Sequence, residues 1–139
     1  MNGIQDNGNQ DKLVTLRWEL NFFERQSLAV LVFGSSLEGE GRDVDICIVK
    51  VKEDLSPKEI LKEIFRKVDV YKKKYDVWFF EELSLYMKME IIESHRVVFC
   101  RDLLELHEYF YQFGKIWKDQ MRRNKLTKDD ILNLPKTIY

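Results

Sequence analysis

Two aspartates separated by one residue, Asp43 and Asp45, stand at the start of the apolar segment DVDICIV. Side chains alternate between the two faces of a β-strand, so both carboxylates would point to one face, about 6 to 7 Å apart along the strand. Burying ionised carboxylates is costly unless positive charge compensates them, and hard cations such as Mg²⁺ prefer carboxylate oxygens. The pair therefore predicts a cation site at the start of this strand.

Residues near this pair are of the types that hold phosphate groups. The apolar run LAVLVF, at 28–33, is followed by Gly34 and Ser35. Glycine permits close backbone approach, and a serine hydroxyl together with backbone N–H groups can hold phosphate oxygens. A third acid, Asp76, stands at the head of a later apolar segment, YDVWFF. Three acids at strand ends, facing a Gly-Ser turn, are typical of two-metal phosphoryl or nucleotidyl transfer.

The hydrophobic pattern predicts the elements that position these residues. Apolar runs indicate strands at 28–33, 43–51, 75–80 and 96–100, and the continuous apolarity of the first predicts burial on both faces. Helical spacing indicates helices at 11–26, 56–73, 84–94 and 102–124, and SPKE, at 56–59, predicts a capping box at the start of the second. The first two strands are joined by a link too short for a crossover helix, which predicts antiparallel pairing, whereas the helix after the second strand is long enough for a crossover. We therefore expect an α+β fold, with a mixed sheet of about four strands and flanking helices.

The composition limits the classes of partner. Lys and Arg number 23 against 24 Asp and Glu, a formal net charge of −1, so no global field would hold the protein on DNA, RNA or an anionic membrane. Nucleic acid and membrane are therefore not expected as partners. No apolar run approaches the roughly 20 residues of a spanning helix, and the first ten residues lack a hydrophobic signal core, which together predict a cytoplasmic protein.

The order of the motifs resembles that of the minimal nucleotidyltransferases of the polymerase-beta-like superfamily. Their signature is a strand ending in Gly-Ser, a link, Asp-x-Asp on the next strand and a third Asp on a later strand. VLVFGSS, DVDICIV and YDVWFF match in that order, and RVVFCRD looks like the closing strand of the family. The resemblance covers roughly residues 13–101. It implies the polymerase-beta-like nucleotidyltransferase fold, in a domain that we place at 11–126 between a flexible N-terminus, 1–10, and a C-terminal tail, 127–139.

The resemblance also implies a site and a reaction. Gly34, Ser35 and Ser36 would bind the nucleotide, ATP or another nucleoside triphosphate. Asp43 and Asp45 would hold two Mg²⁺ ions, and Asp76 would hold one of them while activating the acceptor hydroxyl. The hydroxyl would attack the α-phosphorus, and pyrophosphate would leave.

Small stand-alone members of this family commonly act as antitoxins that modify a HEPN-type ribonuclease toxin at a tyrosine. The resemblance therefore implies transfer of AMP from ATP to a hydroxyl on a partner protein, within a toxin–antitoxin pair. We also expect a partner surface or a homo-oligomer contact on the last helix and the tail 127–139, because exposed aromatic patches mark interfaces. Its aromatic residues are Tyr109, Phe110, Tyr111, Phe113 and Trp117.

Several alternatives stay open at this point. The link SLEGEGR, at 36–42, is shorter than is usual in the family, and its Arg42 stands where a serine is common. An inactive nucleotidyltransferase-fold module that masks a toxin by contact alone would fit these departures. An enzyme acting on a small molecule or an RNA 3′ end is a third hypothesis, with less support. Asp76 could also be a strand-end residue paired with one of the lysines at 72–74, because surface ion pairs form readily.

Overall fold

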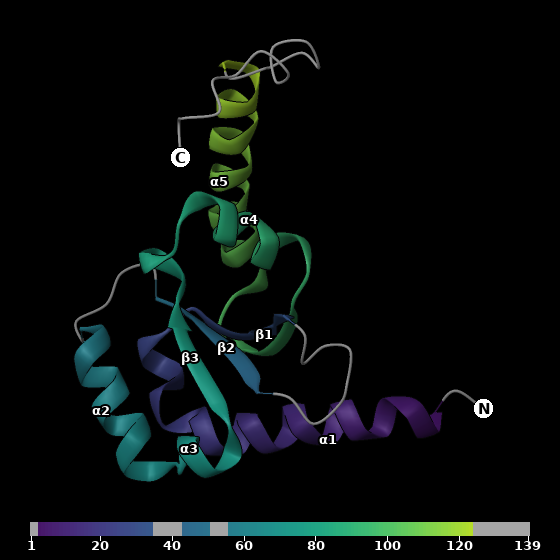
Figure 1. The fold of residues 1–139 in the computed structure, drawn as a ribbon, viewed down its shortest axis with the longest axis vertical. Helices are drawn as coiled ribbons and strands as arrows, with labels where there is room; N and C mark the ends of the chain where they lie inside the picture. The colour runs from purple at the N-terminus through teal and green to yellow at the C-terminus, as the bar shows by residue number, and fades with distance from the viewer. Residues whose placement is uncertain (1–2, 35–42, 51–55, 124–139) are drawn as a thin grey trace, which may run out of the picture.

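The computed structural model describes residues 3–34, 43–50 and 56–123 (Figure 1). The helices are α1 (Gly3–Leu20), α2 (Pro57–Lys67), α3 (Val70–Lys73), α4 (Leu85–Glu93) and α5 (Leu103–Arg123). The strands are β1 (Ala29–Phe33), β2 (Val44–Val49), β3 (Tyr75–Phe79) and β4 (Arg96–Cys100), and two 3₁₀-helices are η1 (Asn21–Gln26) and η3 (Phe80–Glu82).

The four strands form one mixed sheet in the order β3-β2-β1-β4. β1 pairs antiparallel with both β2 and β4, whereas β2 and β3 run parallel. The predicted antiparallel pairing of the first two strands and the predicted mixed sheet are therefore confirmed. A parallel pair needs a crossover connection, and here α2 and α3 supply it between β2 and β3.

Both faces of the sheet are covered, which explains the continuous apolarity of β1. Val30 and Val32 belong to a core cluster that includes Leu16 and Leu20 of α1 and Ile60 of α2. The intervening residues of β1 belong to a second cluster on the other face, which is completed by residues of η3, α4 and α5. Every residue of β1 is accordingly buried.

The crossover begins as predicted but is divided into two helices. The Ser56 hydroxyl accepts a hydrogen bond from the Glu59 N–H, and the Glu59 carboxylate accepts one from the Ser56 N–H, which completes the expected capping box. The expected helix over 56–73 is interrupted after Lys67, where Val68 is buried in extended backbone conformation. The Asp69 carboxylate then caps α3. Packing of Val68 in the core therefore interrupts the helical pattern.

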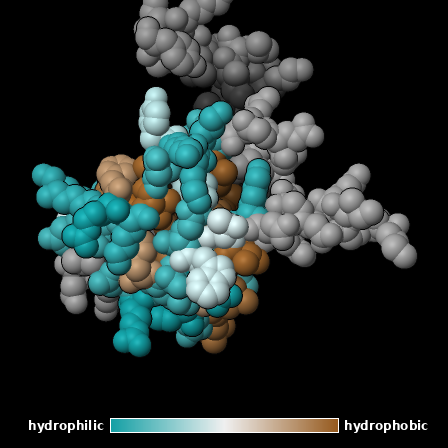
Figure 2. All heavy atoms as spheres, turned by 90° about the horizontal axis from the view of Figure 1, so that it is seen from below, coloured by the Kyte–Doolittle hydropathy of each residue, from teal (hydrophilic) through white to brown (hydrophobic). Residues whose placement is uncertain are grey.

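The first helix also differs from its predicted bounds. It begins at Gly3 rather than at residue 11, and the segment expected to end it, 21–26, forms the 3₁₀-helix η1. The predicted tail, 127–139, lies outside the described residues. In the part of the chain that the structure describes, no helix is both long and apolar enough to cross a membrane. Seen from the side of α1, α2 and α3, the surface is mostly hydrophilic, with apolar side chains gathered between the polar ones (Figure 2).

A half-buried carboxylate, that of Glu81 in η3, joins the end of the sheet to α5. It accepts a hydrogen bond from the backbone N–H of Lys50 at 3.0 Å and another from the Tyr109 hydroxyl at 2.8 Å. Burial, and then the neighbouring Glu81 carboxylate, raise the pKa of the Tyr109 hydroxyl. The base of α5 is thereby fixed to the end of β2 by polar as well as apolar contacts.

Candidate functional site

The parallel pairing of β2 and β3 places Asp45 directly beside Asp76. Neighbouring residues of paired strands point to the same face of a sheet, so the two side chains share a face. Cys47, two residues beyond Asp45, belongs to the core cluster under α4 and α5, which identifies this face. Asp43 lies just before β2, two residues ahead of Asp45, and is exposed. The site therefore lies where β2 and β3 begin, on the face of the sheet that α4 and α5 cover further along the strands.

The electrostatic environment of Asp45 reflects these neighbours. Burial is the largest effect, and it raises the pKa of the Asp45 carboxyl above its ordinary value of 3.8. A hydrogen bond from the indole of Trp78 acts in the opposite direction, and the negative charges of Asp76 and Asp43 raise the pKa further. Asp43 and Asp76 are thus both close enough for their negative charges to act on the Asp45 carboxylate. Repulsion of this kind is relieved when cations bind between carboxylates.

Gly34 closes the site on the side of β1. It follows β1 directly and has a φ of +79°, a conformation that favours glycine. A Cβ atom built on Gly34 would stand 2.6 Å from Oδ2 of Asp45, well inside van der Waals contact. Oδ2 of Asp45 therefore occupies space that is free only because Gly34 has no side chain. The other two predicted nucleotide-binding residues, Ser35 and Ser36, lie outside the described residues, as does the link 36–42.

Replacing Gly34 with alanine is expected to lower both stability and function. A non-glycine residue in this backbone conformation costs roughly 1–3 kcal/mol, and the new methyl group would also displace the Asp45 carboxylate. The free energy of unfolding, measured by urea denaturation, should fall by about that amount. Cation-dependent nucleotide binding should weaken together with it.

The matched control is Gly114→Ala in the interior of α5. A Cβ atom on Gly114 meets no described atom within 4 Å, and alanine is favoured over glycine inside a helix by about 0.5–1 kcal/mol. This variant should therefore be more stable than the wild type and should bind nucleotide normally. Equal effects of the two substitutions would contradict a special role for Gly34.

A hollow of about 750 Å³ adjoins two of the three acids. It is lined by Asp43, Phe65, Val70, Tyr71, Lys74, Tyr75 and Asp76. The alternative in which Asp76 pairs with one of the lysines at 72–74 is not observed among the described residues. Of these lysines, Lys73 pairs with Glu19 instead, with 2.7 Å between Nζ and Oε2. The Asp76 carboxylate is therefore exposed beside a space that can admit a substrate.

The donor set fits magnesium chemically. The candidate ligands are aspartate oxygens, the hard donors that Mg²⁺ prefers, and Mg²⁺ is usually held by one or two carboxylates together with substrate phosphates. Within residues 3–34, 43–50 and 56–123, no group of three or more His, Cys, Asp or Glu side chains is close enough to hold a metal ion by itself. Water molecules, and the phosphates of a nucleotide when one is bound, would complete the coordination of a cation here.

One residue of the site was missed by the sequence analysis. Trp78 donates a hydrogen bond from Nε1 to Oδ1 of Asp45 at 3.3 Å. A signal for it was present, because Trp78 follows Asp76 at a spacing of two and must share its face of β3. A tryptophan in a strand is more often interpreted as a core residue, yet Trp78 is 41% exposed.

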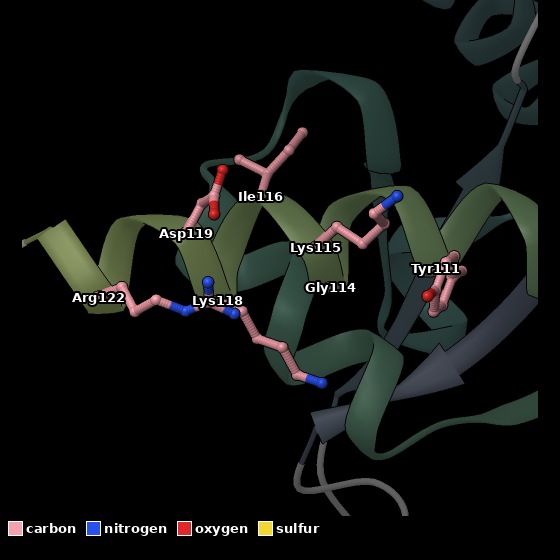
Figure 3. Close-up of a pocket in the computed structure, with 7 residues that line it drawn as sticks. All are labelled: Tyr111, Gly114, Lys115, Ile116, Lys118, Asp119 and Arg122. Atoms are coloured by element: carbon pink, nitrogen blue, oxygen red, sulfur yellow. The ribbon is translucent and has the colours of Figure 1, made fainter.

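The aromatic surface predicted on the last helix is smaller in the structure. Tyr109, Phe110 and Phe113 pack around the buried Phe80 of η3, with ring centroids 5.1 to 5.7 Å from its ring. Tyr111 faces outward and is 67% exposed. The outer side of α5 also lines a separate hollow of about 420 Å³ (Figure 3), whose lining residues are Tyr111, Gly114, Lys115, Ile116, Lys118, Asp119 and Arg122. No predicted site residue lines that hollow.

Comparison with known proteins shows the family of this chain. The family described as "Polymerase beta, Nucleotidyltransferase" matches residues 21–103. A protein of Methanocaldococcus jannaschii that is named as a protein adenylyltransferase is 44% identical in an alignment of 97 residues that covers 68% of this chain and 72% of that relative.

Two solved structures of toxin–antitoxin complexes contain chains of the same fold. One, described with AMP-PNP, has a TM-score of 0.64 at 13% identity, covering 89% of this chain and 98% of the other. The second is a complex of a tri-AMPylated Shewanella oneidensis HEPN toxin with its MNT antitoxin, with a TM-score of 0.63 at 11% identity, covering 88% of this chain and 98% of the other. The fold likeness, the family match and the related sequence agree, and the chain belongs to the polymerase beta nucleotidyltransferase family.

Proposed function

We propose that the chain transfers AMP from ATP to a hydroxyl group of a partner protein, and that it acts as the antitoxin of a toxin–antitoxin pair. The observation that carries the proposal is the position of Asp45, which lies between Gly34 at the end of β1 and Asp76 on β3. This arrangement puts a side-chain-free backbone position, suited to phosphate, on one side of a carboxylate and a second carboxylate on the other.

Each predicted site residue has a role in the proposed reaction. Asp43 and Asp45 would hold two Mg²⁺ ions and Asp76 one of them, with Gly34, Ser35 and Ser36 binding the triphosphate. When bound, Mg²⁺ would neutralise the charge on the phosphates and orient them. The Asp76 carboxylate would accept the proton of the acceptor hydroxyl. The hydroxyl oxygen then bonds to the α-phosphorus, the bond from that phosphorus to its bridging oxygen breaks, and pyrophosphate leaves.

The proposed partner is a HEPN-type toxin. The support comes from the similar solved structures, which are toxin–antitoxin complexes, one with an AMPylated HEPN toxin and another with AMP-PNP. The relative named as a protein adenylyltransferase supports a protein as the acceptor. The hollow beside Asp43 and Asp76 gives an acceptor side chain room to approach the site.

The exposed side chains of α5 favour a second function, in which the chain masks a toxin by contact alone and transfers no AMP. Tyr111, Ile116 and Met121 are exposed on this helix, which projects beyond the rest of the described fold in Figure 1. Exposed apolar residues of this kind can bind a partner without any transfer. The two functions predict different products, so one experiment separates them.

The test incubates the chain with Mg²⁺ and the protein encoded by the neighbouring gene, using ATP labelled at the α-phosphate in one arm and at the γ-phosphate in the other. We expect the partner to become labelled only in the α arm, because AMP is transferred and pyrophosphate is released. A stable complex that silences the ribonuclease with no label in either arm would support the contact-only function. Label in the γ arm would indicate a kinase and overturn the proposal.

A further inference from the structure

Trp78 contacts the site through a single directed hydrogen bond. Its Nε1–H donates to Oδ1 of Asp45, while Oδ2 of the same carboxylate lies toward Gly34. The two oxygens of Asp45 therefore have different surroundings. Oδ1 accepts the hydrogen bond from the indole, and Oδ2 faces the backbone of Gly34. An indole nitrogen is a donor only, so it can orient a carboxylate without accepting a proton or ligating a cation.

Packing does not account for a tryptophan at this position. Trp78 belongs to neither of the two core clusters, and the residue is 41% exposed on β3, which is an edge strand of the described sheet. Its partner across the sheet is Cys47, which is fully buried. A large ring that leaves much of its surface in solvent contributes less hydrophobic stabilisation than its size allows. The hydrogen bond to Asp45 therefore explains a tryptophan at this position better than hydrophobic packing does.

We propose that Trp78 is a positioning residue, whose indole N–H holds Oδ1 of Asp45 so that Oδ2 stays directed toward Gly34 and the nucleotide-binding side of the site. This inference rests on the proposed function, since it assigns Trp78 to the cation and nucleotide site formed around Asp45. Without the indole N–H group, the Asp45 carboxylate can rotate about its side-chain bonds. A binding cation must then restrict that rotation. Fixing a ligand in its binding geometry beforehand increases affinity because this ordering cost is removed.

The sharpest variant replaces Trp78 with 3-benzothienyl-L-alanine, which keeps the shape of the ring but has sulfur in place of the N–H group. Mn²⁺ alone is the probe, and the signal of free Mn²⁺ in electron paramagnetic resonance measures its binding. We expect the affinity to fall about 5- to 20-fold, in line with the loss of one partly solvent-screened hydrogen bond to a charged group. Trp18→Phe, at an exposed indole on α1, is the matched control and should bind Mn²⁺ as the wild type does.

A second measurement tests the hydrogen bond without any cation. The chain has 3 tryptophans, so its ¹⁵N–¹H spectrum contains one indole signal for each. Asp45→Ala should shift the Trp78 signal and leave that of Trp18 in place. Transfer assays should add a separate readout, with kcat lowered in the benzothienyl variant and the KM for ATP changed less than kcat.

The outcomes separate this inference from the proposed function. If the wild type binds Mn²⁺ and the benzothienyl variant binds it equally well, the positioning role is wrong and the proposed function stands. An unmoved Trp78 signal in Asp45→Ala would likewise overturn only the positioning role. If the wild type binds no Mn²⁺ at all, both the inference and the cation-dependent function fail.

Discussion

Replacing Asp76 with asparagine is expected to lower the rate of AMP transfer by about 10²- to 10⁴-fold, the range that general-base catalysis typically contributes. The substitution keeps the shape of the side chain but removes the carboxylate that would take the proton of the acceptor hydroxyl. Nucleotide binding should weaken only modestly, since Gly34 and Asp45 are unchanged. Rapid-quench measurement of transfer, together with separate titration of the nucleotide, distinguishes the two effects.

The matched control for Asp76 is Asp69→Asn, at an exposed aspartate seven residues earlier. Asp69 caps α3 through the N–H of Lys72, and asparagine can also cap a helix, so the fold should be kept. Transfer by this variant should equal that of the wild type. If Asp76→Asn transfers AMP at the normal rate, Asp76 is not the base and its assignment is wrong.

Asp45→Asn is expected to abolish cation-dependent nucleotide binding and transfer while making the fold more stable at neutral pH. The burial and neighbouring charges that raise the pKa of Asp45 mean that its ionised form is less favourable in the folded than in the unfolded chain. An uncharged asparagine does not have this penalty. Urea denaturation without added cations should therefore show a higher free energy of unfolding for the variant.

The pH dependence gives a second check on Asp45. Because the folded state binds the proton more tightly, the stability of the wild type falls as the pH rises from the ordinary pKa of 3.8 through the raised value. The variant lacks this contribution, so its advantage should shrink as the pH is lowered through the same interval. A variant that unfolds at neutral pH would instead make Asp45 a structural residue.

Local patterns in the sequence were enough to predict most elements. Alternation in DVDICIV placed Asp43 and Asp45 on one face of a strand, and the SPKE segment correctly predicted a capping box at the start of α2. The apolar run at 28–33 correctly indicated a strand buried on both faces. These features depend on residues that are close together in the chain, so their physical causes can be read locally.

The contacts that shape the candidate site depend on pairing across the sheet. Asp45 meets Asp76 because β2 and β3 align in one register, and a shift by one residue would turn the two side chains to opposite faces. The close approach of Gly34 to Asp45 and the hydrogen bond from Trp78 follow from the same packing. The sequence predicted that the acids gather beside the Gly-Ser turn, but the Gly34–Asp45 approach and the Trp78 hydrogen bond join residues far apart in the chain and were not predicted from residue types and spacing.

The last helix shows the same division between local and tertiary causes. Its aromatic spacing predicted a helix, but five aromatic residues in sequence did not indicate which would be covered. Packing against Phe80 buried one side of the helix, including Phe110, and left Tyr111 exposed on the other. The sequence by itself determined the strands, the helices and the types of residue able to bind cations and phosphate. Tertiary structure decided which of those residues meet, because the register of paired strands and the packing of helices set distances that no local pattern contains.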